Sequence, residues 1–452
     1  MNVATMLAAV AAASPAAPAT TAQAPTAQPA VKHVWTILLE NKNFADTFGT
    51  QPKSAYLGEL PKQGALVQKY YGTGHASLDN YITMVSGAAP NPVTQSDCQV
   101  FQEFVGGPVG ADGQVVGQGC VYPKEVLTVG DQLKAKGLTY RGYMQDMGAD
   151  PAREPATCAH PAVNGQDHTQ SATAKDQYAA RHNPFMYFHS VIDDQAGCDK
   201  AIVNLDRLPD DLDAVATTPN YSFITPDLCA DGHDAECVNP DQKGGYDGID
   251  AFLREWVPRI TGSKAFKQDG LLVITFDEAA SDDTACCDEP TGPNTPMPGI
   301  NGPGGGQIGA VLLSPRIKPG TVITEPMNHY GYLRSVEDLF GLKHLGYAAQ
   351  DVNKTFQATG VFNNPAVSTT TTAPARPVSR FKVTRKGRRL TIRVKLAAGV
   401  VGKLTVKRHG KVVKRYKTGA SATLRLKGKR PAKVTLRATR RGKTVKRLSR
   451  RK

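Results

Sequence analysis

Two short apolar segments do most to limit the folds open to this chain of 452 residues. They span residues 34–39 and 271–276, and each ends directly in a polar pair, Glu40-Asn41 and Asp277-Glu278. A continuous apolar run of this length predicts a strand that is buried on both faces of a parallel sheet. Because open α/β sheets bind ligands beyond the carboxyl ends of their strands, we expect the two polar pairs at one sheet edge.

Further segments extend this pattern along the chain. Apolar runs that predict strands alternate with periodicities that predict helices, and this alternation is typical of an α/β sandwich. Strands are expected over residues 139–144, 185–188, 222–224, 270–276 and 310–314, and helices over residues 78–85, 129–136, 248–260 and 333–340. Residues 290–306 are rich in Gly, Pro and Asn and predict a long loop beside the strand that ends at Phe276.

The composition changes after Phe362. Residues 366–377 predict an extended Ser/Thr/Ala/Pro linker. Residues 378–452 alternate apolar and polar side chains in short segments, which predicts a small antiparallel β-sandwich. Its strands are expected over residues 381–383, 390–396, 404–406, 423–426 and 434–437.

Charge divides along the same boundary. From Arg376 onward the chain has 30 Lys and Arg and no Asp or Glu, which leaves 24 of the 54 basic and all 40 acidic residues before it, a charge of −16. The basic module therefore has three interpretations: attachment to an anionic cell envelope, nucleic-acid binding through phosphates, or a solvated surface without a partner. Specific nucleic-acid recognition is disfavoured, since Phe381 and Tyr416 are its only aromatic residues.

The N-terminus and the cysteines predict export. Residues 1–30 are expected to be a signal and disordered leader, although no Lys or Arg precedes the apolar stretch at residues 6–13. No stretch approaches the roughly 20 apolar residues of a spanning helix. The eight cysteines lack paired Cys-x2-Cys spacing, which favours disulfides in an oxidising compartment over metal knuckles. Near-neighbour pairing would join Cys98 to Cys120, Cys158 to Cys198 and Cys229 to Cys237, leaving the adjacent Cys286 and Cys287 to pair together or reach elsewhere.

Polar residues at three strand ends are candidate metal ligands. Glu40-Asn41 and Asp277-Glu278 follow the two buried strands, and Asp227 with His233 follows the strand expected near residue 224. Carboxylate and amide oxygens suit a divalent cation. The alternative is that these side chains cap helices or remain solvated.

The segment GHASLDNYITMVSG, residues 74–87, predicts a helix that begins near a serine. The Ser77 hydroxyl would lie beside the first-turn N–H groups, which together with a cation would stabilise its alkoxide. Asn80, about one turn further on, could donate a hydrogen bond to a phosphoryl oxygen. The alternative is a helix-capping serine without chemistry.

Taken together, these segments resemble a known family. The motifs HVWTILLENKNFADTFG, GHASLDNYITMVSG, RHNPFMYF, TPDLCADGHD, GLLVITFDEA, GAVLLSP with PGT, and HYGYLRSVEDLFGL are similar, in this order, to the bacterial phosphoesterases that include acid phosphatases and phospholipases C. That family belongs to the alkaline phosphatase-like superfamily. The resemblance covers about residues 31–346, and it implies a three-layer α/β/α sandwich for residues 31–365.

Carried over by position, the resemblance also implies roles for individual residues. Ser77 would be the nucleophile, passing through a phosphoserine that water then hydrolyses. A divalent metal ion would be bound by Glu40, Asn41, Ser77, Asp277 and Glu278. His182 and His233 would contact the phosphoryl group or protonate the leaving oxygen, helped by His75, while Asp227 and His329 match motif positions of less defined role.

The substrate class follows less directly. The His-x-Ser-Leu-x-Asn-Tyr segment resembles the phosphatases, including those acting on phosphoinositides, so a secreted phosphomonoesterase is the first hypothesis. A phospholipase C that cleaves phosphodiesters is the alternative within the family. A non-catalytic surface protein that binds phosphate or polyanions is the alternative outside it.

Overall fold

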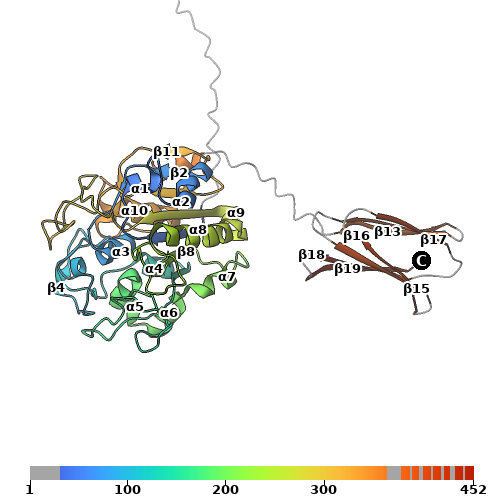
Figure 1. Cartoon of the computed structure of the whole chain (residues 1–452), viewed down its shortest axis with the longest axis horizontal. Helices are drawn as coiled ribbons and strands as arrows, with labels where there is room; N and C mark the ends of the chain where they lie inside the picture. Colours follow the sequence, from blue (N-terminus) through green and yellow to red (C-terminus); the bar gives the residue numbers. More distant parts are fainter. Residues whose placement is uncertain are drawn as a thin grey trace, which may run out of the picture. The chain divides into compact units, whose positions relative to one another are not determined.

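The computed structural model describes residues 31–363 and the strands between residues 378 and 451. The chain divides into two compact units, Met1–Asn364 and Pro365–Lys452 (Figure 1). The predicted leader and linker lie outside the described residues, so both remain predictions.

A sheet of eight strands organises the first unit. Its order is β11-β2-β10-β9-β1-β8-β6-β7, and the five strands from β9 to β7 run parallel. The strands are β1 (His33–Leu39), β2 (Ala65–Val67), β6 (Tyr140–Met144), β7 (Ile202–Asn204), β8 (Tyr221–Thr225), β9 (Gly270–Phe276), β10 (Ala310–Leu313) and β11 (Thr321–Ile323). Short pairs are formed by β3 (Tyr70–Tyr71) with β12 (Met327–Asn328) and by β4 (Val105–Val109) with β5 (Val115–Gln118). The predicted strands β1 and β9 are adjacent, and both are buried along their whole length.

Helices cover both faces of this sheet, as neighbouring residues of β1 show. The Trp35 ring lies 6.1 Å from Phe266 of α9, whereas Thr36 hydrogen-bonds Tyr332 of α10 on the opposite face. One group contains α3, α4 and α10 in mutual contact, and the other contains α2, α8 and α9 (Figure 1). The predicted α/β/α sandwich is confirmed.

The described residues contain ten α-helices, of which four lie at the predicted positions to within about four residues and six were not predicted. The ten helices are α1 (Phe44–Phe48), α2 (Ala55–Glu59), α3 (Ser77–Ser86), α4 (Val129–Ala135), α5 (His189–Ile192), α6 (Gln195–Ala201), α7 (Leu208–Asp211), α8 (Gly245–Gly262), α9 (Lys264–Asp269) and α10 (His329–Phe340). Short 3-10 turns are η1 (Leu60–Gln63), η2 (Thr94–Ser96), η3 (Ala180–His182), η4 (Pro184–Tyr187), η5 (Leu205–Arg207), η6 (Gly346–Ala349) and η7 (Val361–Asn363). Among the described helices, none combines the length and apolar character that crossing a bilayer requires.

One predicted strand is wrong. Residues 185–188 lie largely in the 3-10 turn η4, which begins with Pro184. Proline fixes φ near the helical value at the first position of a turn. The segment is buried on every side, so its apolar run carried no periodicity to separate a strand from a turn.

The C-terminal unit contains two antiparallel sheets around one core. The first sheet consists of β13 (Val378–Lys386), β14 (Arg389–Leu396) and β17 (Ala422–Lys427), and the second of β15 (Val401–Arg408), β16 (Lys411–Thr418), β18 (Lys433–Arg440) and β19 (Lys443–Arg451). Buried side chains from both sheets, among them Ile392 and Leu404, form a single apolar cluster. This is the predicted β-sandwich, with β16 and β19 in addition to the predicted strands.

Four disulfides stabilise the first unit. They join Cys98 to Cys120, Cys158 to Cys198, Cys229 to Cys237 and Cys286 to Cys287. The near-neighbour pairing is confirmed, and the two adjacent cysteines pair with each other. Three of these bonds lie in loops that reach the carboxyl edge of the sheet, where they limit the movement of the segments described next.

Candidate active site at the carboxyl edge of the sheet

Glu40 occupies the centre of this edge, directly after β1. Its carboxylate is fully buried, with Oε2 accepting a hydrogen bond from Ser77 Oγ at 2.9 Å and Oε1 accepting one from Tyr81 at 2.7 Å. Burial raises the pKa of Glu40 well above its usual range, and the carboxylates of Asp277 and Asp231 raise it further. A carboxylate held among other acids in this way is well suited to bind a cation.

Ser77 is the first residue of helix α3, not its cap. The cap position belongs to Ala76, whose side chain makes no capping hydrogen bond. The interpretation of Ser77 as a simple helix-capping residue is therefore wrong. Its hydroxyl is almost completely buried and directed at Glu40, where the positive end of the helix dipole favours negative charge on oxygen.

The second acidic pair follows β9 beside Glu40. Asp277 Oδ1 accepts hydrogen bonds from the backbone N–H groups of Asn41 and Glu278, while its Oδ2 is buried without a partner. Burial, followed by the charge of Asp277, raises the pKa of Glu278 well above its usual range. His75 Nδ1 lies 3.7 Å from Glu278 Oε1. Asn41 thus joins the site through its backbone, although the sequence suggested its amide side chain.

Asn80 shapes this part of the site from one turn into α3. Its Nδ2 donates to Glu278 Oε2 and to two backbone carbonyls, and its Oδ1 accepts from the backbone N–H groups of Thr73 and Gly74. Both ends of the amide are therefore engaged within the protein. Asn80 positions the turn before Ser77 and the Glu278 carboxylate, and the expectation of a free donor for a phosphoryl oxygen is not met.

His182 lies between two carboxylates. Its Nε2 is 3.4 Å from Glu40 Oε1 and its Nδ1 is 3.2 Å from Asp231 Oδ2, but neither contact has hydrogen-bond geometry. Burial lowers the pKa of His182 well below its usual range, with a further contribution from Arg181. Because the ring is then neutral, we read these contacts as a group of ligand atoms and not as ion pairs. Glu40, His182 and Asp231 each offer one ligand atom, and these three atoms all lie within 4.8 Å of one another.

The loop after β8 carries Asp231 into the site. Glu40 N–H donates to the Asp231 carbonyl, and the Lys42 ammonium donates to the carbonyls of Glu40 and Gly232. Asp227, the predicted candidate in this loop, instead accepts from the N–H groups of Cys229 and Ala230. Its carboxylate stabilises the loop and does not join the cluster.

Several buried polar atoms at this edge lack partners among the described residues. They are Asp231 Oδ2, Asp277 Oδ2, both ring nitrogens of His182, His75 Nδ1 and both carboxylate oxygens of Asp79. An unpaired buried polar atom costs roughly 1–3 kcal/mol, so such a concentration is unfavourable without a ligand. Among the described residues, the ligand atoms of Glu40, His182 and Asp231 lie close enough to hold a divalent cation. In this part of the chain the predicted ligands Asp277 and Glu278 do not form such a group with Glu40, so the predicted metal set is only partly brought together.

Arg181 supplies positive charge at the same edge. Its guanidinium is buried, with Nη2 3.4 Å from His233 Nε2 and Nε 4.0 Å from Asp97 Oδ2. His233 Nδ1 contacts Asp234 at 2.7 Å. Since arginine can only donate, His233 Nε2 accepts and its Nδ1 carries the proton in this arrangement.

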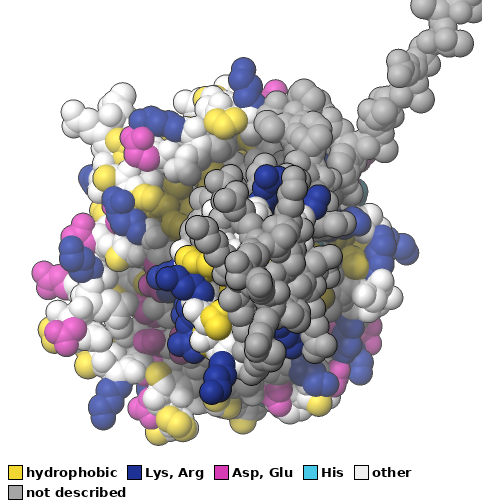
Figure 2. Space-filling model, turned by 90° about the vertical axis from the view of Figure 1, so that its right-hand side faces the viewer, with side chains coloured by type: hydrophobic (Ala, Val, Ile, Leu, Met, Phe, Trp, Pro, Cys, Tyr) yellow, Lys and Arg dark blue, Asp and Glu magenta, His cyan; other side chains and the backbone are white. Residues whose placement is uncertain are grey.

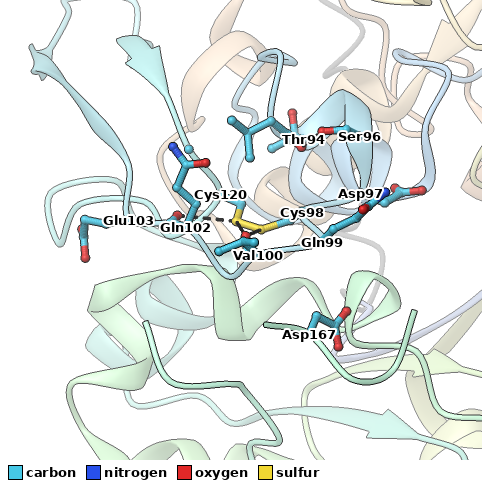
Figure 3. The surroundings of a disulfide bond; sticks show 12 residues. Thr94, Ser96, Asp97, Cys98, Gln99, Val100, Gln102, Glu103, Cys120 and Asp167 are labelled. Carbon is cyan, nitrogen blue, oxygen red and sulfur yellow. Dashed lines mark hydrogen bonds between the residues drawn. A yellow bond between two sulfur atoms is a disulfide. The ribbon is translucent and has the colours of Figure 1, made fainter. Parts of the chain in front are cut away.

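Asp97, directly after η2, contacts the first turn of α3. Its Oδ1 accepts a hydrogen bond from Leu78 N–H at 3.0 Å, next to the Ser77 hydroxyl. Figure 3 shows Asp97 beside the Cys98–Cys120 disulfide, with its carboxylate turned away from the sulfur atoms. Both Asp97 and Cys98 have φ near 50°, in the left-handed region that few non-glycine residues adopt. The disulfide thus stabilises the turn that presents Asp97 to the helix.

His329 contacts the site through the backbone of Asp277. It is fully buried, its Nε2 donates to the Asp277 carbonyl at 2.6 Å, and its Nδ1 accepts from Tyr70. Burial lowers the pKa of His329 to about 4, so the ring is neutral and has both nitrogens engaged. It fixes the backbone of Asp277 rather than contacting a substrate.

Sequence reasoning missed Asp231, Arg181 and Asp97. The first two were readable, because Asp231 lies two residues before His233 and Arg181 directly precedes His182 within motifs already singled out. Asp97 carried no local signal, since only the fold brings the turn before Cys98 to the start of α3.

The fold and this edge describe an α/β protein with a buried Glu/His/Asp group that could hold a metal ion. The model of the "Phosphoesterase family" matches residues 51–343, well over half of the chain, so the chain belongs to that family. The match spans Ser77, Asn80, His182, His233, Asp277 and Glu278, while Glu40 and Asn41 lie just before it.

Similar proteins include phosphatases from fungi and bacteria. A phosphate-repressible acid phosphatase of Penicillium chrysogenum is 26% identical over 290 residues, which cover 64% of this chain and 55% of that protein. A phosphatidylinositol-3-phosphatase of Mycobacterium tuberculosis is 23% identical over 325 residues, covering 72% of this chain and 82% of that one. The chain spans about half the length of the fungal acid phosphatases it matches.

Solved structures overlap with the chain only loosely. A protein in the alkaline phosphatase superfamily from Vibrio parahaemolyticus gives a TM-score of 0.42 at 12% identity, over 90% of this chain and 80% of that one. A phosphonate monoester hydrolase from Silicibacter pomeroyi gives 0.39 at 9% identity, over 88% and 89%. Overlaps of this size carry no argument about activity.

Proposed function

We propose that the chain is an exported, metal-dependent phosphoesterase that hydrolyses phosphate monoesters with Ser77 as nucleophile. The observation that carries this proposal is the buried Ser77 hydroxyl at the start of α3, 2.9 Å from Glu40 and among acids without partners. Membership of the phosphoesterase family supports the reaction class. The acid phosphatases among the similar proteins support monoesters as the first substrate class.

Ser77 is oriented for attack on phosphorus. The hydrogen bond to Glu40 fixes the Ser77 oxygen, and its position in the first turn of α3 favours the alkoxide. Attack forms a phosphoserine and releases the alcohol of the ester. Water then attacks the phosphoserine and releases phosphate, with the same groups acting in reverse.

The cation would be held by one of two sets of residues that share Glu40. One set adds Ser77, Asp277 and Glu278, and the other adds His182 and Asp231. A divalent cation in such a site lowers the pKa of a bound hydroxyl and neutralises charge on phosphoryl oxygens. His182 has a carboxylate on each side and is neutral, so it serves the cluster better as a ligand than as the proton donor that the sequence suggested.

Three groups remain to act on the substrate directly. Arg181 is the buried cation nearest His233, and its fork can bind two phosphoryl oxygens. His233 is exposed at the edge of the site and His75 lies beside Glu278, so these two histidines are the candidates that protonate the departing alcohol.

A phospholipase C remains the alternative within the family. The discriminating assay compares p-nitrophenyl phosphate with p-nitrophenylphosphorylcholine in the presence of a divalent cation and after chelation. We expect the monoester to be cleaved faster, and cleavage of both to stop with chelator. Faster cleavage of the diester would select the phospholipase, and tight phosphate binding without cleavage of either would select a non-catalytic binding protein.

Export is proposed from the disulfides. All eight cysteines are paired in the first unit, and disulfides persist in oxidising compartments. Recovery of the protein from the medium, with no free thiols before reduction, would support this localisation. Recovery from the cytoplasm with eight free thiols would contradict it.

We also propose that the C-terminal module holds the enzyme on anionic polymers or lipids of the cell envelope. Lys403 of β15 pairs in register with Lys417 of β16, so like charges lie opposite each other, and the module contains no acid. Such pairs are unfavourable unless an external anion neutralises them. Figure 2 shows both acidic and basic side chains on the described surface of the whole chain that faces the viewer.

The module can be tested with vesicles. Vesicles containing an anionic phospholipid should retain the full chain at low salt and release it as salt rises, while neutral vesicles should not. Replacing Lys403 and Lys417 with Gln should weaken retention, and replacing Lys264 and Lys267 of α9 with Gln is the matched control. Binding to DNA with no binding to anionic vesicles would favour the nucleic-acid interpretation.

A further inference from the structure

A cavity of about 320 Å³ begins beside the candidate active site. Thr73 forms part of its wall, and the Thr73 N–H and hydroxyl both donate to Asn80 Oδ1. Asn80 in turn donates to Glu278 Oε2 and lies one helical turn from Ser77. The cavity therefore shares a wall residue with the hydrogen-bond network that positions the acids of the site.

The opposite wall is formed by the disulfide between the adjacent residues Cys286 and Cys287. Cys287 and Asp288 have φ of 77° and 57°, two consecutive non-glycine residues in the left-handed region. Such conformations persist where the surrounding structure enforces them, and they concentrate at ligand sites. The disulfide presents two polarizable sulfur atoms, which offer an apolar surface without a strong hydrogen-bond donor.

The loop that carries this disulfide is fixed to the segment leading into Ser77. Gly72 N–H donates to the Gly306 carbonyl, and Gly305 N–H donates back to the Gly72 carbonyl. A Cβ on Gly305 would lie 2.0 Å from the Gly74 oxygen, so the two segments are in direct backbone contact. The cavity wall and the approach to the nucleophile consequently move as one piece.

Glu289 is the acidic residue that continues the cavity wall after Cys287 and Asp288. Its Oε1 accepts from Asn328 Nδ2 at 2.6 Å, and its Oε2 is buried with no hydrogen-bond partner among the described residues. A carboxyl group at this place disfavours a second phosphate and favours a hydroxyl donor. Tyr330 adds an aromatic side chain to the same wall.

We propose that this cavity binds the alcohol part of the substrate, and that this part is an uncharged hydroxylated ring, such as a sugar or a cyclitol. The ring would lay its C–H face on the Cys286–Cys287 disulfide and donate a hydroxyl hydrogen bond to Glu289. The volume lies at the lower end of the range of small-molecule sites, about 300–1,000 Å³, and accommodates a ring but not lipid chains. This inference rests on the proposed function, because it names the ester that Ser77 would cleave.

The kinetic test compares esters that reach the cavity with one that does not. Phosphate release is measured for glucose 1-phosphate, myo-inositol 1-phosphate and methyl phosphate in the wild type, in Glu289→Gln and in the double variant Cys286→Ser/Cys287→Ser. We expect KM for the ring esters to rise about tenfold in both variants, while methyl phosphate changes by less than about twofold. Glu325→Gln, an exposed acid, is the matched control. An equal change for all three esters, or no change for any, would overturn the proposal.

A second measurement does not depend on turnover. The rate at which a mild phosphine reduces Cys286–Cys287 is followed by alkylation and mass spectrometry, with and without free myo-inositol or glucose, in Ser77→Ala. A bound ring should slow reduction of this disulfide and leave Cys158–Cys198 unaffected. If the ring slows reduction of the disulfide but the wild type hydrolyses no ester, the ring-binding cavity is supported and the proposed phosphatase function is refuted. If the wild type hydrolyses the esters but the ring does not slow reduction, the function is supported and the ring-binding cavity is refuted.

Discussion

The two ends of the central sheet differ in how their buried charges are satisfied. A cavity of about 630 Å³ lies at the amino ends of β6, β7 and β8, and several of its charged side chains form ion pairs. Asp211, for example, contacts Arg141 at 3.0 Å and Arg207 at 3.2 Å, and also accepts from Tyr143. The carboxyl end instead gathers Glu40, Asp231 and Asp277 with several atoms that have no partner.

This difference is more informative than the size of the cavities. Ion pairs at the amino end neutralise one another and leave nothing for a ligand to satisfy. Burial raises the pKa of Glu40 and Asp231 at the carboxyl end, and neighbouring acids raise it further, an effect that a bound cation would oppose. Volume alone would favour the amino end of the sheet, whereas the unsatisfied donors and acceptors favour the carboxyl end as the candidate site.

The largest expected effect comes from exchanging one serine hydroxyl at each end. Ser77→Ala should lower kcat on p-nitrophenyl phosphate at least about a thousandfold, because the nucleophile is lost. Ser190→Ala at the amino-end cavity removes a hydroxyl that donates to Asp131 and should leave kcat within about twofold. Equal activity of the two variants would refute the assignment of the active end, provided that both unfold as the wild type does.

A smaller effect is expected from exchanging one buried acid at each end, measured by urea unfolding in chelator. Asp211→Asn should destabilise the protein by about 2–3 kcal/mol, because it leaves Arg141 without its partner. Glu40→Gln should leave stability unchanged or raise it, because it removes a buried charge that its neighbours repel.

The effects of these two variants on activity should be the reverse of their effects on stability. Asp211→Asn should retain most of the activity once folded, whereas Glu40→Gln should lose nearly all of it with any divalent cation. Strong destabilisation of the chelated protein by Glu40→Gln would mean that this carboxylate is structurally paired, and the contrast between the two ends would then fail.

The sequence predicted the acids of the active end because their positions follow from the sheet. An apolar run followed by Glu40-Asn41 or by Asp277-Glu278 leaves little choice about where those residues lie once the strands are parallel. The helix at Ser77 was equally readable from its periodicity and its C-terminal glycine, Gly87, which adopts φ 70°.

What the sequence could not predict depends on contacts between loops. Asp227 and Asp231 are four residues apart in one loop, and only its folded path decides which one reaches Glu40. In the C-terminal unit, β16 and β19 escaped prediction because Lys and Arg occupy half or more of their positions and weaken the apolar alternation. The pairing of like charges between β15 and β16 can be seen only from the register of these strands.

Glu337 tests whether an unpaired acid alone marks a site. It is buried on α10, its Oε1 accepts from Leu345 N–H, and its Oε2 has no partner among the described residues, yet neither Ser77 nor Glu40 contacts it. Burial raises the pKa of Glu337 to about 9. A carboxyl whose folded pKa exceeds its unfolded value binds more protons in the folded state, so its stabilising effect is present at low pH and is lost as pH rises from about 4.5 to about 9.

Glu337→Gln should remove this pH dependence. At pH 8 the variant should be more stable than the wild type by about 4–5 kcal/mol, and at pH 4 the two should be equal, as measured by urea unfolding across pH. Activity should be unchanged, because this isolated acid has no second ligand group beside it. A loss of activity would show that a single buried acid without a partner is enough to indicate a functional group, even when no other unpaired groups lie beside it.

The smallest effect separates the two arginines that pair with Asp211. Arg207 is about half exposed, and such pairs contribute roughly 0–1 kcal/mol because water and salt screen them. Arg141 is three-quarters buried and also donates to the Lys200 carbonyl at 2.6 Å. Arg207→Ala should therefore cost about 0.5 kcal/mol or less and lose even that in high salt, while Arg141→Ala should cost more and be less sensitive to salt, in the same urea measurement. If both variants lowered the free energy of unfolding by the same small amount, the ion pairs at the amino end would contribute little to stability. The two ends of the sheet would then differ mainly in their number of unsatisfied polar groups.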